Sequence, residues 1–342
     1  MNRTYDQWKE SFIDKVRVRM QVDADLKDRG DVVIQPVSRV NVGILEGITM
    51  PHLTEAGLSP VIFLNDLYEE YQSGIPEDIL VWRTVNQFSA GKDVPFNMDA
   101  IKDYAAVKDD LRFRVSGYEQ NRGWAEAMVS VKEGDFVYSC YLPIYHEAFG
   151  RASISITKEN AVNWGVSYEQ ILMDAKAGSM KQPVELKSTM EILGEACDLF
   201  EGEPTDYYAH PEHLPEEENM FVLREKDSLY GASVIARADV LKQVGKILND
   251  DYYVLPSSTQ EVLLIPAKRW NDPERLAEMV REINETEVEP RERLTDHVQF
   301  YDRSRERLMN AVEYRYQKRS QERMDSGRIM ARNRSVRDDY ER

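Results

Sequence analysis

Tyr252 to Pro266 reads YYVLPSSTQEVLLIP. Two apolar runs, Tyr252–Leu255 and Glu261–Ile265, flank a polar connector of Pro, Ser, Thr and Gln. Short runs rich in aromatic and branched residues are typical of strands, and a connector rich in turn-forming residues joins such strands as an antiparallel hairpin. The stretch therefore predicts an antiparallel sheet in the C-terminal half of the chain.

The neighbours of this hairpin extend the predicted sheet. They follow the order ββαββα, with strands Met220–Arg224 and Ala232–Ala236, helix Ala238–Leu248, the hairpin itself, and helix Pro273–Asn284. Asp272 and Pro273 suit the N-cap and the first position of the last helix. We expect residues 220–290 to form a four-stranded antiparallel sheet with two helices on one face.

A separate group of helices and strands is predicted over residues 1–95. Thr4 and Gln7 have the spacing of a capping box, and Gly30 is a helix stop. A helix over 4–29 follows from apolar side chains three or four residues apart, which are Tyr5, Trp8, Phe12, Val16 and Met20. The other elements are strands Val32–Val37, Val40–Ile48 and Pro60–Leu64, and helices Asn65–Gln72 and Pro76–Ala90.

Residues 96–187 are predicted to complete the first domain as a β-rich segment. Ser167 is the predicted N-cap of a helix over Tyr168–Ala177. The strands are Asp110–Val115, Trp124–Val131, Phe136–Leu142 and Ala152–Thr157. The chain is thus predicted to be α+β, with two domains of antiparallel sheet covered by helices. An acidic helix and linker over 188–219 joins the domains, and a charged helix with a disordered basic tail follows over 291–342.

Charge is distributed unevenly along the 342 residues, whose net charge is −17. Ser188 to Leu223 carries ten Asp or Glu residues and no Lys or Arg, whereas the tail 302–342 has a net charge of +4. The acidic body argues against binding to nucleic acid or to an anionic membrane, because both need clustered Lys and Arg. Nucleic acid is expected only through the tail, and a solvated tail or a partner-docking helix is the alternative. A helix is predicted there up to Met324, from the apolar residues Tyr301, Leu308, Val312 and Tyr316.

The sequence favours a cytoplasmic protein. Its N-terminus opens into a charged segment without the apolar region of a signal peptide, and no apolar run approaches the roughly 20 residues of a spanning helix. Cys140 and Cys197 are too few for a disulfide framework and belong to no C-x-x-C pair, which fits a reducing compartment.

Most catalytic and cofactor motifs are absent from the sequence. It has no Gly-rich nucleotide loop, no Gly-x-Ser-x-Gly elbow, no His-Glu-x-x-His and no Cys/His zinc spacing. The closest approach to a metal cluster is His210-Pro211-Glu212-His213, which we interpret as an exposed loop because its Pro prevents regular helical presentation. We therefore predict no cofactor and no metal site.

Two polar and aromatic segments supply the candidate binding residues. The first is the hairpin connector, with Ser257, Ser258, Gln260 and Glu261. One interpretation is a turn whose hydroxyls accept hydrogen bonds from its own backbone amides. The alternatives are a loop that recognises a ligand, and a serine nucleophile, which would need His297 nearby. The second is Asn65, Tyr68 and Tyr71, where Asn65 is a possible helix cap and the two rings share one helix face. Core or interface packing of those rings is the alternative to a binding pocket.

The chain resembles an uncharacterised family of bacterial proteins, a domain-of-unknown-function group common in Firmicutes. The resemblance covers about residues 5–300. It rests on the motif YVLPSS-x-x-EVLLIP within 252–266, and on VIFLNDLYEEY at 61–71, LYGAS at 229–233 and MVREIN at 279–284. It implies a bacterial cytoplasmic origin and assigns no catalytic residue.

These observations predict a non-enzymatic protein-binding or adaptor module, acting on a protein partner or as a homo-oligomer. One alternative is a hydrolase-like enzyme with a serine and carboxylate site, and a second is a nucleic-acid-associated protein acting through its Arg-rich tail.

Overall fold

The computed structural model describes residues 3–324, except 54–58, 92–100, 147–149, 198, 200–201, 216, 257, 271 and 322. Its strands pair in antiparallel sheets and alternate with helices along the chain, so the predicted α+β class is confirmed. Within that part of the chain, no helix combines the length and the apolar character needed to cross a bilayer.

The chain divides into two compact units. The first contains the chain up to Arg114 together with Glu119–Val131 and Ser139–Lys181. The second contains Val115–Tyr118, Lys132–Tyr138 and the chain from Gln182 onward. The second unit therefore includes two short pieces of chain that lie, in sequence, between parts of the first.

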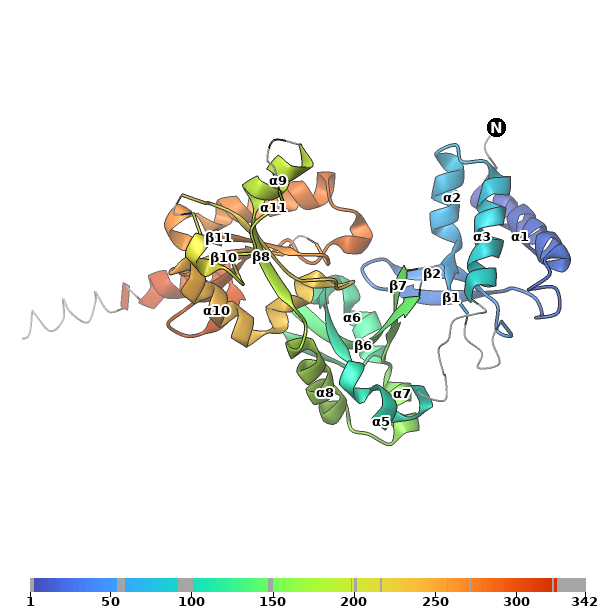
Figure 1. The fold of residues 1–342 in the computed structure, drawn as a ribbon, viewed down its shortest axis with the longest axis horizontal. Coiled ribbons are helices and arrows are strands. Elements are labelled where there is room, and N and C mark those ends of the chain that lie inside the picture. The colour runs from blue at the N-terminus through green and yellow to red at the C-terminus, as the bar shows by residue number, and fades with distance from the viewer. Residues whose placement is uncertain are drawn as a thin grey trace, which may run out of the picture. The chain divides into compact units, whose positions relative to one another are not determined.

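The N-terminal elements of the first unit follow the predicted order. They are α1 (Tyr5–Val22), β1 (Val33–Arg39), β2 (Gly43–Thr49), β3 (Ile62–Phe63), α2 (Leu64–Gln72) and α3 (Glu77–Gly91). The strands form an antiparallel sheet in the order β1-β2-β3, and the three helices lie side by side (Figure 1). Their shared core is centred on the predicted stripe of α1, in which Trp8, Phe12, Val16 and Met20 are buried.

Helix α1 begins as predicted and ends earlier than predicted. The Thr4 hydroxyl accepts the Gln7 N–H at 3.5 Å while the Gln7 side chain accepts the Thr4 N–H at 3.2 Å, which makes the capping box. The helix ends at Val22, eight residues before Gly30, because Asp23 adopts an extended conformation and its carboxylate accepts the Asp25 N–H at 3.0 Å. A local side-chain bond of this kind competes with helix continuation.

The rest of the first unit corrects one predicted strand. Trp124–Val131 was predicted as a strand, but its first half, Trp124–Ala127, belongs to a helix, and only its end, Ser130–Val131, belongs to a strand. The helix forms because Asn121, Trp124 and Ala125 are buried at helical spacing. The elements are α5 (Tyr104–Val107), η1 (Lys108–Asp110), β4 (Arg112–Gly117), α6 (Tyr118–Ala127), β5 (Ser130–Glu133), β6 (Phe136–His146), β7 (Gly150–Ser155), α7 (Lys158–Trp164) and α8 (Tyr168–Met180). Strands β4, β6 and β5 form a sheet in that order, with β7 paired to β6, and β4, β5 and β6 contribute residues to both units.

Helix α8 confirms a predicted cap and shows a close backbone approach. Ser167 caps it by accepting the Gln170 N–H at 3.2 Å. Near its other end, Gly178 lies so close to Leu111 that an added Cβ atom would be 2.0 Å from the Leu111 carbonyl oxygen. This position therefore has room for glycine alone.

The second unit is built on a sheet of six strands, where four were predicted. Their order is β13-β12-β10-β11-β9-β8, and every neighbouring pair is antiparallel. The strands are β8 (Val184–Ser188), β9 (Phe221–Glu225), β10 (Tyr252–Leu255), β11 (Val262–Pro266), β12 (Gln299–Asp302) and β13 (Arg307–Asn310). The predicted hairpin is confirmed as β10 and β11, with Tyr252 opposite Pro266.

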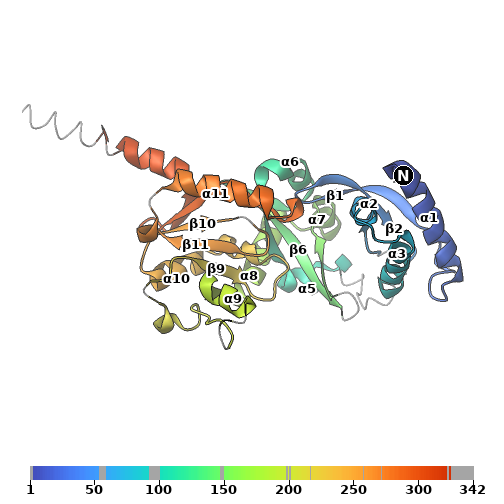
Figure 2. The same cartoon turned by 90° about the horizontal axis from the view of Figure 1, so that it is seen from above.

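Helices cover both faces of this sheet, which corrects the prediction of one covered face (Figure 2). Helix α11 (Pro273–Thr286) packs on the face that presents Tyr253 and Ile265. On the other face, the Tyr252 hydroxyl donates to the Leu241 carbonyl of α10 (Ala238–Leu248) at 2.8 Å. Strands buried on both faces are apolar at every position, and the run VLLIP of β11 has that pattern.

Among the described residues, the remaining elements of this unit before its tail are one α-helix and four 3₁₀ turns. They are α9 (Thr189–Ala196), η2 (Pro211–His213), η3 (Gly231–Ala236), η4 (Ala267–Arg269) and η5 (Pro290–Glu292). The predicted strand Ala232–Ala236 is wrong, since η3 occupies this position. Residues 231–235 are all buried, and the Ala232 N–H donates to the Thr259 carbonyl at 3.2 Å, so the segment packs as a compact turn beneath the hairpin connector.

The tail begins as strands and only then becomes a helix, so the helical stripe predicted from Tyr301 onward is wrong at its start. The Asp302 carboxylate accepts the N–H groups of Ser304 and Arg305 at 2.9 and 3.1 Å and so fixes the turn between β12 and β13. A helix follows over 311–321, capped by the Asn310 side chain, which accepts the N–H groups of two residues in the first turn at 3.1 and 3.2 Å. The predicted disorder after residue 327 lies outside the described residues.

Candidate functional site

The predicted residues Tyr68 and Tyr71 join two helices of the first unit. The ring of Tyr68 is centred 5.3 Å from that of Trp8, and its hydroxyl donates to the Arg3 carbonyl at 2.8 Å. The Arg3 guanidinium lies 5.2 Å from the centre of the Tyr71 ring. Asn65 lies within the first turn of α2, where its side-chain oxygen accepts the Glu46 N–H at 3.4 Å.

The hairpin connector is held by bonds within the second unit. Ser258 accepts the Gln260 N–H on its hydroxyl at 3.0 Å, and the Thr259 N–H donates to the Glu292 carbonyl at 2.8 Å. Glu261 lies 3.6 Å from an Arg224 nitrogen, and burial raises the pKa of its carboxyl above the ordinary value. Ser257 lies outside the described residues. These bonds favour the turn interpretation for Ser258.

The closest approach to a catalytic pair was not predicted. His297 and Asp135 lie 3.1 Å apart, from Nδ1 to Oδ1. Gln299 and Asn310 donate to the other carboxylate oxygen at 2.8 and 3.0 Å. Burial alone would raise the pKa of Asp135, but the hydrogen bonds from His297, Gln299 and Asn310 lower it to about 2. The hydrogen bond to Asp135 raises the pKa of His297 above 6.5, against the opposite effect of burial.

This pair has the orienting half of a hydrolytic site, and no hydroxyl or thiol of the described residues is hydrogen-bonded to the His297 ring. A carboxylate on Nδ1 orients the ring as in a catalytic triad, and the His297 side chain is 53% exposed. The neighbouring hydroxyls have other partners: Thr295 accepts the N–H of His297 at 3.2 Å, and Ser258 holds its own turn. In the described part of the chain, no three His, Cys, Asp or Glu side chains are placed to hold a metal ion.

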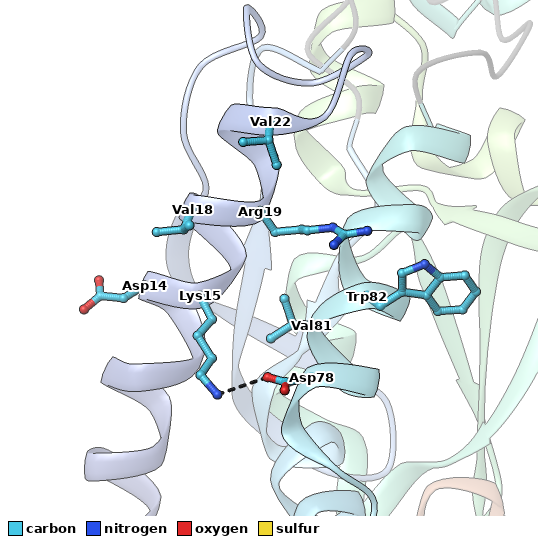
Figure 3. Close-up of a pocket in the computed structure, with 8 residues that line it drawn as sticks. All are labelled: Asp14, Lys15, Val18, Arg19, Val22, Asp78, Val81 and Trp82. Atoms are coloured by element: carbon cyan, nitrogen blue, oxygen red, sulfur yellow. Dashed lines mark hydrogen bonds and ion pairs between the residues drawn. The ribbon is translucent and has the colours of Figure 1, made fainter.

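A groove in the first unit offers a more accessible site. Helices α1 and α3 lie along each other and leave a hollow of about 620 Å³ beside their contact. It is lined by Asp14, Lys15, Val18, Arg19, Val22, Asp78, Val81 and Trp82. Figure 3 shows Arg19 reaching from α1 toward α3, and the Trp82 ring on the side of α3 that lies away from α1.

The groove is formed by apolar side chains on the solvent side of both helices. Val18 and Val22 are 64% and 76% exposed, one helical turn apart on α1. Trp82 on α3 is 49% exposed. Helix α1 already packs on the core through its buried side chains Trp8, Phe12, Val16 and Met20. Val18, Val22 and Trp82 therefore add apolar surface that the fold itself does not bury.

The charges on the groove are unevenly paired. The Lys15 ammonium lies 3.1 Å from Asp78 and 3.3 Å from Glu77. Burial lowers the pKa of Lys15, but these two carboxylates raise it above the ordinary value. Arg19 makes no hydrogen bond or ion pair with any residue between 3 and 324 that the structure describes. The groove therefore presents one cation that is available to a ligand.

A family model matches most of the sequence. That model, described as a family of unknown function (DUF5688), matches residues 9–303. The chain belongs to this family. No curated protein and no solved structure matches the DUF5688 chain significantly.

The DUF5688 match includes the groove and the Asp135–His297 pair and leaves out the tail helix. The sequence reasoning missed the groove because it accounted only for the core stripe of α1. Val18 and Val22 lie off that stripe and are four residues apart. When one apolar stripe of a helix is buried in the core, a second apolar stripe on the same helix indicates a docking face.

Proposed function

We propose that this DUF5688 protein is a non-enzymatic protein-binding module whose groove between α1 and α3 holds a segment of a partner protein. The observation that carries the proposal is the cluster of exposed Val18, Val22 and Trp82 around Arg19. Exposed apolar side chains that line a hollow with polar residues around them are typical of interaction sites.

The chemistry of the groove specifies its occupant. Burying one Val or Leu-sized side chain contributes about 1.5–3 kcal/mol, so an apolar partner residue seated against Trp82 supplies affinity. Trp and Arg are the residue types that most often dominate interface energies. Because Lys15 is already paired and Arg19 is not, the partner segment is expected to carry a carboxylate next to its apolar residue.

Peptide display on the full chain tests this proposal. Random peptides selected for binding should share apolar residues with a neighbouring Asp or Glu. A selected peptide should change the fluorescence of Trp82, the half-exposed tryptophan, and its affinity should fall about tenfold or more for Trp82→Ala and for Arg19→Glu.

The matched control is Tyr145→Ala, which removes an exposed aromatic side chain of the same unit that is 73% exposed and outside the groove. It should leave peptide affinity unchanged. Peptides with a basic consensus, or peptides that bind Trp82→Ala as well as the wild type, would show that the groove is not the site. Concentration-dependent mass in sedimentation, abolished by Trp82→Ala, would instead identify a second copy of the chain as the occupant.

A reducing cytoplasm is the compartment that we propose for this binding. The two cysteines are free, one buried and one exposed, and an exposed free thiol is characteristic of proteins kept reduced. Alkylation of Cys197 in freshly lysed cells should show that its thiol is reduced in vivo.

A further inference from the structure

We propose that helix α9 and its acidic surroundings form a second docking surface, which takes a basic amphipathic helix of a partner protein. This inference goes beyond the groove and does not rest on it, since it uses residues of the other unit and the opposite charge preference.

Helix α9 has an apolar side that faces solvent. Met190 and Leu193 are 62% and 55% exposed. With Cys197, they follow the spacing of three and four that places side chains on one side of a helix. Leu199, which is 75% exposed, is held at the end of this helix because its N–H donates to the Gly194 carbonyl at 2.8 Å.

Helix α9 is held to the rest of the unit by several hydrogen bonds, so its exposed side chains lie on an ordered helix. The Ser188 hydroxyl caps it by accepting the N–H groups of Met190 and Glu191 at 3.1 and 3.3 Å. The Glu191 carboxylate accepts the Thr205 N–H at 2.8 Å and the hydroxyl of Tyr207. The Thr189 hydroxyl and N–H both donate to the Met220 carbonyl, at 2.9 and 3.1 Å. A rigid helix presents its side chains in a fixed pattern, which reduces the entropy cost of docking.

The charge around α9 identifies the occupant. The sequence from Ser188 to Leu223 has ten carboxylates and no Lys or Arg. Among the described residues, Glu195 is exposed on α9, and Glu217 is exposed next to Glu218, whose carboxylate accepts the Ser188 hydroxyl at the start of α9. The C-terminal end of α9 adds a partial negative charge and has no basic residue in its last turn. An apolar side in a negative field complements a helix with Leu or Met on one face and Lys or Arg on the other.

The position of Cys197 makes this surface directly testable. Cys197 is exposed on α9 whereas Cys140 is buried, so the uncharged reagent iodoacetamide modifies Cys197 in the folded chain. The probe is a peptide of about 18 residues with Leu and Lys in helical spacing, long enough to form an isolated helix. The controls are the same peptide with Glu in place of Lys and a peptide with the Leu and Lys positions scrambled.

The Leu/Lys peptide should bind the full chain and slow the alkylation of Cys197 roughly tenfold at saturation. Its affinity should fall about tenfold for Leu193→Asp and also when the ionic strength is raised from about 0.05 to about 0.5 M. Two variants should keep wild-type affinity: Met173→Asp on α8, where Met173 is 65% exposed, and Trp82→Ala in the groove.

Three results would overturn the proposal. Equal protection by the scrambled peptide would mean that the negative charge alone attracts it. Unprotected Cys197 in the presence of bound peptide would place the binding elsewhere. Protection of Cys197 by raising the concentration of the chain alone would make a second copy the occupant.

Discussion

Nδ1 of His297 lies 3.1 Å from Oδ1 of Asp135, and this contact joins the turn between β5 and β6 to the start of β12. The carboxylate also accepts hydrogen bonds from Gln299 and Asn310, and the Asp135 carbonyl accepts the Tyr118 N–H at 2.9 Å. The side chain of Asp135 thereby ties three separate stretches of the second unit together, and its backbone carbonyl adds a fourth. We expect its removal to loosen the unit as a whole.

The stability contributed by this ion pair should have a pH optimum. The pKa of Asp135 falls from 3.8 to about 2, so its contribution is present above pH 3.8 and is lost as the pH falls toward 2. The pKa of His297 is raised above 6.5, so its contribution is present below pH 6.5 and is lost as the pH rises through the folded-state value.

The difference in Tm between the wild type and His297→Gln should therefore be largest between pH 3.8 and 6.5, as measured by thermal unfolding across the pH range. His210→Gln is the control, since the His210 side chain is 60% exposed, and it should give a small difference. A His297→Gln difference that stays constant with pH would mean that the pair is not ionised as proposed.

Asp135→Ala should destabilise the chain by about 1–3 kcal/mol, because the donors of Gln299 and Asn310 lose a partly buried charged acceptor. Urea unfolding followed by circular dichroism measures the change. Glu133→Ala, at an exposed position of the same hairpin, should change the free energy of unfolding by less than about 0.5 kcal/mol. Equal effects of the two variants would contradict a specific role for Asp135.

Truncation of two tryptophans should change the free energy of unfolding by very different amounts. Trp8 is fully buried with its ring stacked on Phe12 at 4.8 Å, so Trp8→Ala should cost about 3–5 kcal/mol. Trp82 is half exposed in the groove, so Trp82→Ala should cost little stability while removing binding. Chemical denaturation of both variants gives the comparison, and a large loss in Trp82→Ala would mean that the ring supports the fold.

Two helical glycines provide a second matched pair. Gly178→Ala should destabilise by about 1–3 kcal/mol, because its new methyl group would collide with the Leu111 carbonyl oxygen. Gly123→Ala in α6 meets no atom within 4 Å and should stabilise by about 0.5–1 kcal/mol through helix propensity. Thermal melts of both variants should show shifts of opposite sign.

The local features of this fold were predictable because local residues determine them. The capping box at Thr4, the cap at Ser167 and the β10–β11 hairpin each depend on neighbours in sequence, and each is confirmed. Trp124–Val131 and Ala232–Ala236 were mistaken for strands because short apolar runs do not distinguish a buried strand from a buried helix or turn.

The sites were harder to predict because they depend on distant residues. Nothing in the sequence around Asp135 indicates partners at 297, 299 and 310. The groove combines residues of two helices, and only the α1 half carries a sequence signal. The rings of Tyr68 and Tyr71 could be assigned to one helix face, but their contact with Trp8 required the structure.

The separation between Asp135 and its partners also constrains how the protein is made. Gln299 follows Asp135 by 164 residues and Asn310 by 175. At the usual speed of translation, these partners leave the ribosome roughly ten to thirty seconds after the β5–β6 turn. During that interval the emerging chain exposes the edges of an unfinished sheet, so the second unit completes its folding only after Asn310 has left the ribosome.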